Sequence, residues 1–321
     1  MHEIVTTIYA YKSSVFIARL DGNITSIKLP QSWYKFSSKV KPYSFEIRNL
    51  EKIVSGMQAL KGVLFVATPN FLINFDLEDN YLSNEGFKKY VADCTKIKID
   101  YQNKILFAAS EERGIVALKI SNPRNPLFLT DMKLDISGKQ YISEMDVFDN
   151  TVYLAIRNLG IIRIDYNENE FKKPKITRTV RKIKLEDPQD VKYNKHNKYL
   201  YIADSDQGFL LLSTINNQLV FSQQLPNFDS PKKIILHYQN ALIQGSKGLY
   251  MFNKADETIQ VIFDYKIGAS TKYYNKFIYY NDGFLNLLIL GKSDTLDLND
   301  TGYNPFKNIF SYSKKEIRRI K

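Results

Sequence analysis

Internal repetition is the feature of this sequence that most limits its fold. A short apolar strand, ending in Ala in five of seven copies, recurs along the chain. The copies are Val15–Ala18, Leu64–Ala67, Leu106–Ala109, Val152–Ala155, Leu200–Ala203, Ala241–Gln244 and Phe277–Tyr280. Their last residues are 49, 42, 46, 48, 41 and 36 positions apart. A period of roughly 44 residues with about four short strands per unit is typical of a β-propeller blade, so the repeat predicts seven blades.

The fourth unit shows how the strands follow one another inside a repeat. Alternation of apolar and polar residues places an inner strand at Ser143–Phe148, and a tight turn at Asp149–Asn150 leads into a second strand at Thr151–Ile156. After a polar loop closed by Gly, a third strand is predicted at Ile161–Tyr166 and an outermost strand at Lys175–Arg181. The second strand is apolar almost throughout, as expected of a strand covered on both faces by neighbouring blades. In the fifth unit the first three strands are predicted at Asp190–Tyr193, Tyr199–Ala203 and Phe209–Ser213.

These patterns predict an all-β single domain, a seven-bladed β-propeller with four-stranded antiparallel blades. The blades are expected at roughly 1–50, 51–92, 93–138, 139–186, 187–228, 229–268 and 269–312, followed by a basic tail at 313–321. The first predicted strand, Ile4–Tyr11, is an inner one, so the ring closes either within blades or through C-terminal residues that join the first blade. Leu29–Tyr43 and Asp294–Phe310 lack clean alternation and are predicted to form long connections.

Residues 114–134, GIVALKISNPRNPLFLTDMKL, resemble the LVIVD repeat, in which an aliphatic strand runs into a D-[IV]-S-[ND]-P-x-[NK]-P turn and then a short outer strand. Residues 121–126 (SNPRNP) match this turn, while Lys119 stands where the family usually has Asp. Tyr199–Leu211 is similar to the family's Y-[VA]-A-x-x-x-x-G-L segment, and the remaining units share only the spacing and the apolar pattern. The resemblance implies a propeller repeat of surface, secreted and multidomain proteins, generally without assigned catalysis. Independently, the two prolines lack the N–H that a strand ladder needs, so this turn is expected to be an exposed connection.

The charge of the chain favours acidic partners. Its 321 residues include 45 Lys and Arg against 34 Asp and Glu, a net charge of 45 − 34 = +11. Such a charge favours nucleic acid, an anionic membrane surface or an acidic protein, although heavy use of Lys, Asn, Ile, Tyr and Phe also follows from A/T-rich coding sequence. The single cysteine, Cys94, excludes an intramolecular disulfide. No signal peptide or membrane-spanning stretch is recognisable, which favours a place inside the cell, in the cytoplasm or an organelle.

No set of residues has a recognisable catalytic or ligand spacing. His2, His196 and His237 have no Cys or His partner at metal-ligand spacing, and His196 is expected at the surface. The loop Asp204–Gly208 resembles a Ca²⁺ loop but lacks the third acidic ligand and the distal Glu, so a Gly-closed turn is expected there. Cys94 begins an apolar inner strand and is expected to be buried. The sequence therefore predicts no catalytic residue, no metal ligand and no cofactor, while leaving open whether the chain is an enzyme.

Two clusters of basic residues are the candidate interaction sites. The first, here called the rim patch, maps to the outer edge of the fourth blade, and the second, the tail patch, lies in the tail. The rim patch consists of Lys172, Lys173, Lys175, Arg178, Arg181, Lys182 and Lys184, and the tail patch of Lys314, Lys315, Arg318, Arg319 and Lys321. Basic residues on an outer strand also prevent unwanted edge pairing, which is the structural alternative. Neither patch has the interleaved aromatic residues that stack on bases, so sequence-specific reading of nucleic acid is not expected.

The loops between the second and third strands are expected on one common face, around one mouth of the ring. Their charged residues are Arg19, Asp21, Glu111, Glu112, Arg113, Arg157, Asp204, Asp206, Lys247 and Asp282. Mixed charges around a mouth either bind a polar ligand or are simply solvated. Because no convergent triad stands out among them, solvated loops are the favoured interpretation.

These observations favour a non-catalytic interaction or scaffold propeller that is a subunit of a larger assembly. Two alternatives remain. The central mouth would hold the site of a small-molecule-binding or hydrolytic propeller, or the basic patches would attach the protein electrostatically to RNA or an anionic membrane. The expected partners are therefore proteins of a complex, with RNA and anionic membrane surfaces as the alternatives.

Overall fold

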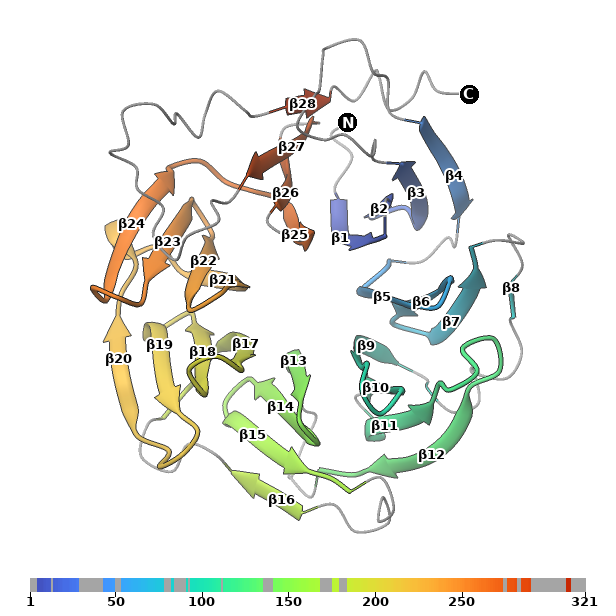
Figure 1. The fold of residues 1–321 in the computed structure, drawn as a ribbon, viewed down its shortest axis with the longest axis horizontal. Helices are drawn as coiled ribbons and strands as arrows, with labels where there is room; N and C mark the ends of the chain where they lie inside the picture. Colours follow the sequence, from blue (N-terminus) through green and yellow to red (C-terminus); the bar gives the residue numbers. More distant parts are fainter. Residues whose placement is uncertain are drawn as a thin grey trace.

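The chain folds into a ring of antiparallel sheets around a central axis (Figure 1). The computed structural model describes residues 5–12, 14–28, 43–49, 53–77, 82–83, 91, 93–110, 112–134, 141–167, 175–178, 184–273, 276–281, 284–289 and 310–312. Within these residues, 28 strands form seven four-stranded sheets, each built from four consecutive strands. The prediction of a seven-bladed β-propeller is confirmed.

Each blade contributes one strand to each of four concentric layers. The inner strands are β1 (Val5–Tyr11), β5 (Gly56–Leu60), β9 (Cys94–Asp100), β13 (Ile142–Phe148), β17 (Pro188–Asn194), β21 (Pro231–His237) and β25 (Ala269–Tyr273). The second strands are β2 (Ser14–Arg19), β6 (Val63–Thr68), β10 (Ile105–Ser110), β14 (Thr151–Ile156), β18 (Tyr199–Asp204), β22 (Asn240–Gly245) and β26 (Lys276–Asn281). The third strands are β3 (Asn23–Lys28), β7 (Phe71–Asp76), β11 (Gly114–Lys119), β15 (Gly160–Asp165), β19 (Gly208–Ser213), β23 (Leu249–Asn253) and β27 (Phe284–Ile289). The outer strands are β4 (Tyr43–Asn49), β8 (Leu82–Ser83), β12 (Leu127–Met132), β16 (Lys175–Arg178), β20 (Leu219–Gln223), β24 (Thr258–Phe263) and β28 (Phe310–Tyr312).

The predicted strands of the fourth and fifth units agree with the structure to within a few residues. The strand Thr151–Ile156 is confirmed as predicted, and both residues of the Asp149–Asn150 turn have positive φ, 47° and 58°, as a tight hairpin turn requires. The third strand begins one residue earlier than predicted, at Gly160, whose φ of 92° suits glycine. Two segments predicted to be connections end in strand, because Tyr43 starts β4 and Phe310 starts β28. The rest of those two segments, and the tail, lie outside the described residues.

The ring closes between whole blades. The first blade has the sheet order β1-β2-β3-β4 and the seventh β25-β26-β27-β28, so neither described sheet borrows a strand from the other end of the chain. β1 and β25 lie against each other across the seam, with β28 outermost in the last blade (Figure 1). Of the two modes of closure left open by the sequence, closure within blades is the one observed.

The hydrophobic core lies between the blades, in layers that run from one sheet to the next. Alternate side chains of a second strand face opposite neighbours because a strand has a period of two. In β10, Phe107 and Ala109 pack against the fourth blade, while Leu106 and Ala108 pack against the second. All four side chains are fully buried, which explains why the second strands have almost no polar residues.

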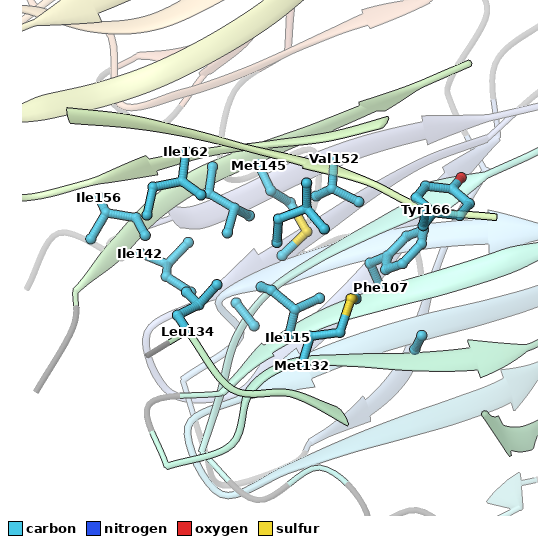
Figure 2. Packing of buried hydrophobic residues seen from close by; sticks show 14 of the residues in the cluster. Phe107, Ile115, Met132, Leu134, Ile142, Met145, Val152, Ile156, Ile162 and Tyr166 are labelled. Carbon is cyan, nitrogen blue, oxygen red and sulfur yellow. The ribbon is translucent and has the colours of Figure 1, made fainter. Parts of the chain in front are cut away.

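The interface between the third and fourth blades shows this packing in detail (Figure 2). Phe107 of the third blade faces Tyr166 of the fourth, with ring centroids 5.1 Å apart. Met145 and Val152 fill the space beside them, and both are completely buried. The Tyr166 hydroxyl donates a hydrogen bond to the Asp100 carboxylate of the third blade, so a polar contact accompanies the apolar ones.

The turn of residues 121–126, which resembles the LVIVD turn, fastens the third blade to the second. The Asn74 side-chain amide donates a hydrogen bond of 2.9 Å to the carbonyl oxygen of Pro123, and the Arg124 guanidinium pairs with the Asp76 carboxylate. The turn is a connection after β11, as predicted, and most of it is exposed. Pro123 is the exception: it is buried, because the turn packs on the end of β7 instead of standing free in solvent.

The described residues contain no helix with the length and apolar character needed to cross a membrane.

Candidate functional site

The inner strands line a central cavity of about 690 Å³. The last residue of each repeat, from Ala18 in the first blade to Tyr280 in the seventh, pairs with one residue of the neighbouring inner strand. These seven partners occupy equivalent positions in their blades, so they align the inner strands with one another. Side chains facing the cavity alternate with side chains buried between blades, such as Ile97, Met145 and Val191. The alignment therefore defines two rings of cavity-lining residues.

The upper ring lies nearer the start of the inner strands, and the lower ring lies two residues further along. The upper ring consists of Thr7, Gly56, Lys96, Glu144, Asp190, Lys233 and Ala269. The lower ring consists of Tyr9, Gln58, Lys98, Asp146, Lys192, Ile235 and Thr271. We call the face at which the inner strands start the top face; it carries the connections between blades and the loops between second and third strands.

Charge is distributed unevenly around these rings. All of their charged residues come from blades three to six, whereas blades seven, one and two contribute neutral side chains. In the upper ring the neutral residues are also small: Ala269, Thr7 and Gly56 stand next to one another because β25 adjoins β1 across the seam. The cavity therefore has one charged wall and one wall of small residues.

Ion pairs connect the charged side chains of the wall. Lys98 Nζ lies 2.9 Å from Asp146 Oδ1, and Lys192 Nζ lies 2.7 Å from Asp190 Oδ1. Lys96 Nζ lies 4.0 Å from Glu144 Oε2. Burial alone would raise the pKa of Glu144, but the positive charges of Lys192 and Lys96 outweigh it and lower that pKa to about 2.

The carboxylates of the wall also bind backbone groups of the next blade. Asp146 Oδ2 accepts a hydrogen bond of 2.9 Å from the Tyr193 N–H, and Asp190 Oδ2 accepts one of 2.7 Å from the Ile234 N–H. In the first blade, the Tyr9 hydroxyl accepts a hydrogen bond of 3.1 Å from the Ala59 N–H. An inner strand is the edge of its sheet, so these side chains satisfy N–H groups that no strand ladder reaches.

Three lysines on blades six and seven have no carboxylate partner among the described residues. Lys233 Nζ donates to the Ser270 carbonyl oxygen and Lys272 Nζ to the Leu236 carbonyl oxygen. At the mouth, Lys232 Nζ lies 3.3 Å from Ser205 Oγ. Burial lowers the pKa of Lys233 to about 8, although the carboxylates of Asp190 and Glu144 act in the opposite direction, and burial also lowers the pKa of Lys272.

Tyrosines close part of the lower end of the cavity. The Tyr101 hydroxyl lies 3.1 Å from the Tyr9 hydroxyl and donates a hydrogen bond of 3.4 Å to Gln58 Oε1. Burial raises the pKa of Tyr9 far above its ordinary value, so this hydroxyl stays protonated. Below the wall of small residues, the lower end of the cavity is therefore lined by the uncharged polar side chains of Tyr9, Gln58 and Tyr101.

Tyr141 and Phe228 are the most exposed aromatic side chains of the described part of the top face. Tyr141, at the cavity mouth, is 54% exposed, and the Arg157 guanidinium lies 5.4 Å above its ring. Arg157 is itself held by Asp187, with Nε 2.6 Å from Oδ1. Phe228 is 87% exposed in the connection between the fifth and sixth blades.

The turn that carries Phe228 is fixed by the buried carboxylate of Asp229. Phe228 belongs to the 3₁₀ turn η2 (Pro226–Phe228) and has a φ of 50°, a left-handed conformation that is rare for an aromatic residue. Five groups donate to the Asp229 carboxylate: the N–H groups of Ser246, Lys247 and Gly248 and the hydroxyls of Ser246 and Tyr250. Burial opposes ionisation of Asp229, but these hydrogen bonds lower its pKa.

The charged loop residues predicted to share one face do so where the structure describes them. Arg113, Arg157, Asp204, Asp206 and Lys247 lie in or next to loops between second and third strands, on the top face. None of these five is among the described residues that line the cavity. Glu111 and Asp282 lie outside the described residues.

The rim patch lies mostly outside the described residues. Lys175 and Arg178 are the end residues of β16, the outer strand of the fourth blade, where the patch was expected to lie. Lys184 is exposed and forms an ion pair with Glu186. The other four members and the whole tail patch fall in undescribed segments, so binding through either patch stays a prediction.

The remaining candidate residues have ordinary structural roles. Cys94 is completely buried, as predicted, and burial raises the pKa of its thiol far above the ordinary value. His196 is exposed, also as predicted. Asp204 Oδ1 accepts the N–H groups of Asp206 and Gln207 at 2.9 Å, which makes this loop a side-chain-stabilised turn. Among the described residues, no group of three or more His, Cys, Asp or Glu side chains is placed to hold a metal ion.

The charged rings were missed at the sequence level, although a signal for them exists. Aligning the inner strands in place of the second strands brings together Lys96-Ile97-Lys98, Glu144-Met145-Asp146 and Asp190-Val191-Lys192. A charged residue on each side of one apolar residue, repeated in three successive blades, would have marked these side chains as facing the axis.

The comparisons with known proteins concern the fold alone. Neither a protein-family model nor a curated protein sequence matches this chain. Among solved structures, it is similar to the WD40 β-propeller domain of Doa1, with a TM-score of 0.66 and 11% identity over 92% of this chain and 95% of that one. It is also similar to the computationally designed Ika8 protein, with a TM-score of 0.60 and 10% identity over 90% of this chain and 97% of that one. Together with the seven sheets, these similarities establish a seven-bladed β-propeller.

Proposed function

We propose that this propeller is a non-catalytic interaction module, a subunit or scaffold of a larger assembly, that binds a protein partner through its top face. The observation that carries the proposal is the exposure of Tyr141 and Phe228 on that face. Large aromatic side chains and Arg dominate the energy of protein interfaces, and these two rings are among the most exposed of the described residues.

The Tyr141 ring and the backbone turn that carries Phe228 are held in place before any partner arrives. Arg157 stacks on Tyr141 and is in turn paired with Asp187. Phe228 precedes Asp229, whose carboxylate is anchored by the loop of residues 246–248. A side chain that is already ordered loses less conformational entropy on binding, so this arrangement favours affinity.

The propeller fold supports an interaction role in general, because WD40-like propellers commonly bind protein partners. The identity of the partner rests on chemistry alone. The net charge of +11 favours an acidic protein, and the rim patch would offer it a second contact beside the top face. RNA and anionic membrane are the competing partners for such a charge.

We also propose that the chain is an LVIVD-repeat protein. The contacts of residues 121–126 support a structural reason for the repeat's turn: Asn74 and Asp76 at the end of β7 bind the turn of the following blade. In this proposal the motif serves blade-to-blade attachment and has no catalytic part.

The experiment that tests the interaction role is purification of the tagged full chain from its native source, followed by cross-linking mass spectrometry. We expect a stoichiometric protein partner with cross-links to the top face. Phe228→Ser and Tyr141→Ser should each weaken binding about tenfold or more, since central aromatic anchors contribute roughly 2 kcal/mol or more. Leu127→Ser is the matched control, because Leu127 is 67% exposed but lies on the rim strand β12.

Two other results would identify the alternatives. The first is binding that falls steeply with salt and is lost on charge reversal at Arg178, Arg181 and Lys182, but not in Phe228→Ser. This result would assign the interaction to polyanions that bind the rim patch. Recovery of the chain without any partner, with both aromatic variants behaving as wild type, would overturn the proposed role of the top face.

A further inference from the structure

We propose that the central cavity binds a small oxyanion, a phosphate or carboxylate group of a polar molecule, with Lys233 and Lys272 as its contacts and the wall of Ala269, Thr7 and Gly56 beside it. This site is separate from the top-face surface of the proposed function. Its occupant is a small molecule bound on β21 and β25, whereas Tyr141 of that surface lies at the cavity mouth and Phe228 is not among the lining residues.

The balance of charge inside the cavity favours an anion. Among the described residues, six lysines line the cavity against three acids, an excess of 6 − 3 = +3. The lysines are Lys96, Lys98, Lys192, Lys232, Lys233 and Lys272, and the acids are Glu144, Asp146 and Asp190. The acids all lie on β13 and β17. Each of them has a lysine within 4.0 Å: Lys96 or Lys98 of β9, or Lys192 of β17. The excess is therefore local to blades six and seven, and charges of one sign that line a cleft attract an anion more strongly than the same charges on a flat surface.

The two lysines also have hydrogen-bond donors to spare. A protonated lysine has three N–H donors and no acceptor. Lys233 and Lys272 each use one, toward the carbonyl oxygens of Ser270 and Leu236. Both side chains are half-buried and line the cavity, so two donors remain on each ammonium group for a ligand there. An oxyanion offers several acceptor oxygens at once and would satisfy them.

The cavity offers space for a ligand next to these donors. Lys233 in the upper ring is followed around the ring by Ala269, Thr7 and Gly56, whose short side chains leave the axis open. A volume of about 690 Å³ falls in the range of small-molecule sites, roughly 300–1,000 Å³.

The protonation of Lys233 gives the site a pH dependence. The charged groups that act on this lysine are Asp190 and Glu144, which favour its protonated form, and Lys192 and Lys96, which oppose it. Burial outweighs the two acids and brings the pKa to about 8, and a bound anion would raise it again. Oxyanion binding should therefore be strong at pH 6.5 and weaken as the pH rises through about 8.

The test uses the full chain with inorganic phosphate and, separately, succinate as probes, with sodium chloride at matched ionic strength as the reference. We expect at least one probe to raise the melting temperature saturably, because a ligand bound only by the folded state stabilises it. Lys233→Met and Lys272→Met should raise the half-saturating concentration about tenfold or more. Lys195→Met removes the same charge from an exposed site on the fifth blade and should leave it unchanged.

The two probes distinguish the sources of the anion. A response to phosphate alone would assign a phosphorylated ligand, and a response to succinate alone a carboxylate. If either lysine variant does not fold, lysine acetylation of the wild-type chain, followed by mass spectrometry, gives the same answer: the probe should protect Lys233 and Lys272 but not Lys195. Absence of saturable stabilisation by both probes, or equal loss in the Lys195→Met control, would overturn the proposal.

Discussion

The Oδ2 atom of Asp190 lies 2.7 Å from the backbone nitrogen of Ile234, which belongs to the next blade. The same carboxylate pairs through Oδ1 with Lys192 at 2.7 Å, so one buried side chain joins two blades and balances one lysine. Asp190 is only 1% exposed, so its carboxylate is stabilised by these two contacts and not by water.

Replacement of Asp190 by Ala should destabilise the fold strongly. The change leaves both the Ile234 N–H and the Lys192 ammonium without their partner, and breaking a buried ion pair on one side costs about 3–5 kcal/mol. Urea denaturation followed by circular dichroism measures the loss. The exposed Asp206 is the control, and Asp206→Ala should stay within about 0.5 kcal/mol of wild type. Equal midpoints for the two variants would contradict the role given to Asp190.

Glu144 should make stability fall in acid. Its pKa is lowered from 4.5 to about 2 in the folded protein, so the folded state prefers the ionised form more than the unfolded chain does. The resulting stabilisation, roughly 3 kcal/mol from the size of this shift, is fully present above about pH 4.5 and is lost as the pH falls toward 2. Glu144→Gln should flatten the dependence of the unfolding free energy on pH in this window. A variant whose acid profile parallels that of wild type would show that other carboxylates govern it.

Gly245 should not accept even one additional methyl group. A Cβ atom at this position would stand 2.0 Å from Asp229 Oδ2 and 2.7 Å from its Cγ, so Gly245→Ala would push the anchored carboxylate out of its ring of donors. We expect a loss of about 2–4 kcal/mol by thermal or urea unfolding, in line with a buried hydrogen-bond network that is broken. At Gly56 the nearest atom would be Ile97 Cγ1 at 3.4 Å, so Gly56→Ala is the matched control and should be tolerated.

Asn74 should contribute to the attachment of the turn at residues 121–126. Asn74→Ala removes the donor to the Pro123 carbonyl oxygen at a side chain that is 2% exposed, and we expect a loss of about 1–3 kcal/mol. Arg124→Ala should cost less, about 0–1 kcal/mol, because that side chain is 58% exposed and its ion pair is partly solvated. A double-mutant cycle measures whether the two contacts act together; the reverse order of the single losses would contradict this assignment.

The ring of blades could be predicted from the sequence because its signals are local and repeated. The Asp149–Asn150 turn and the apolar second strands such as Thr151–Ile156 depend on nearby residues and on burial by two neighbours, which every blade has. The charged wall could not be predicted in the same way. Lys96 and Lys98 flank one apolar residue, which is equally the pattern of a strand with one face in solvent. Whether that face meets water or Glu144 and Asp146 of the next blade is decided only when the ring closes.

The exposure of Phe228 could not be predicted from the sequence either, because it depends on contacts between loops. Phe228 follows Pro226 and Asn227 in a polar connection, where a single Phe gives no periodic signal. Its exposure depends on the left-handed turn, and that turn depends on Asp229 meeting the loop at residues 246–248. The contact joins two loops of the sixth blade that only the folded sheet brings together.

Because each sheet is complete in one contiguous stretch of chain, a blade can assemble on the ribosome soon after its own four strands have been synthesised. Strand pairing within a blade never has to wait for distant residues. The contact between β1 and β25 is the exception, since it joins the first and last described blades and forms only when all the others are in place. Until then, the apolar flanks of the first and seventh blades face solvent, which makes the seam the place where an unfinished ring is most open to chaperones and to aggregation.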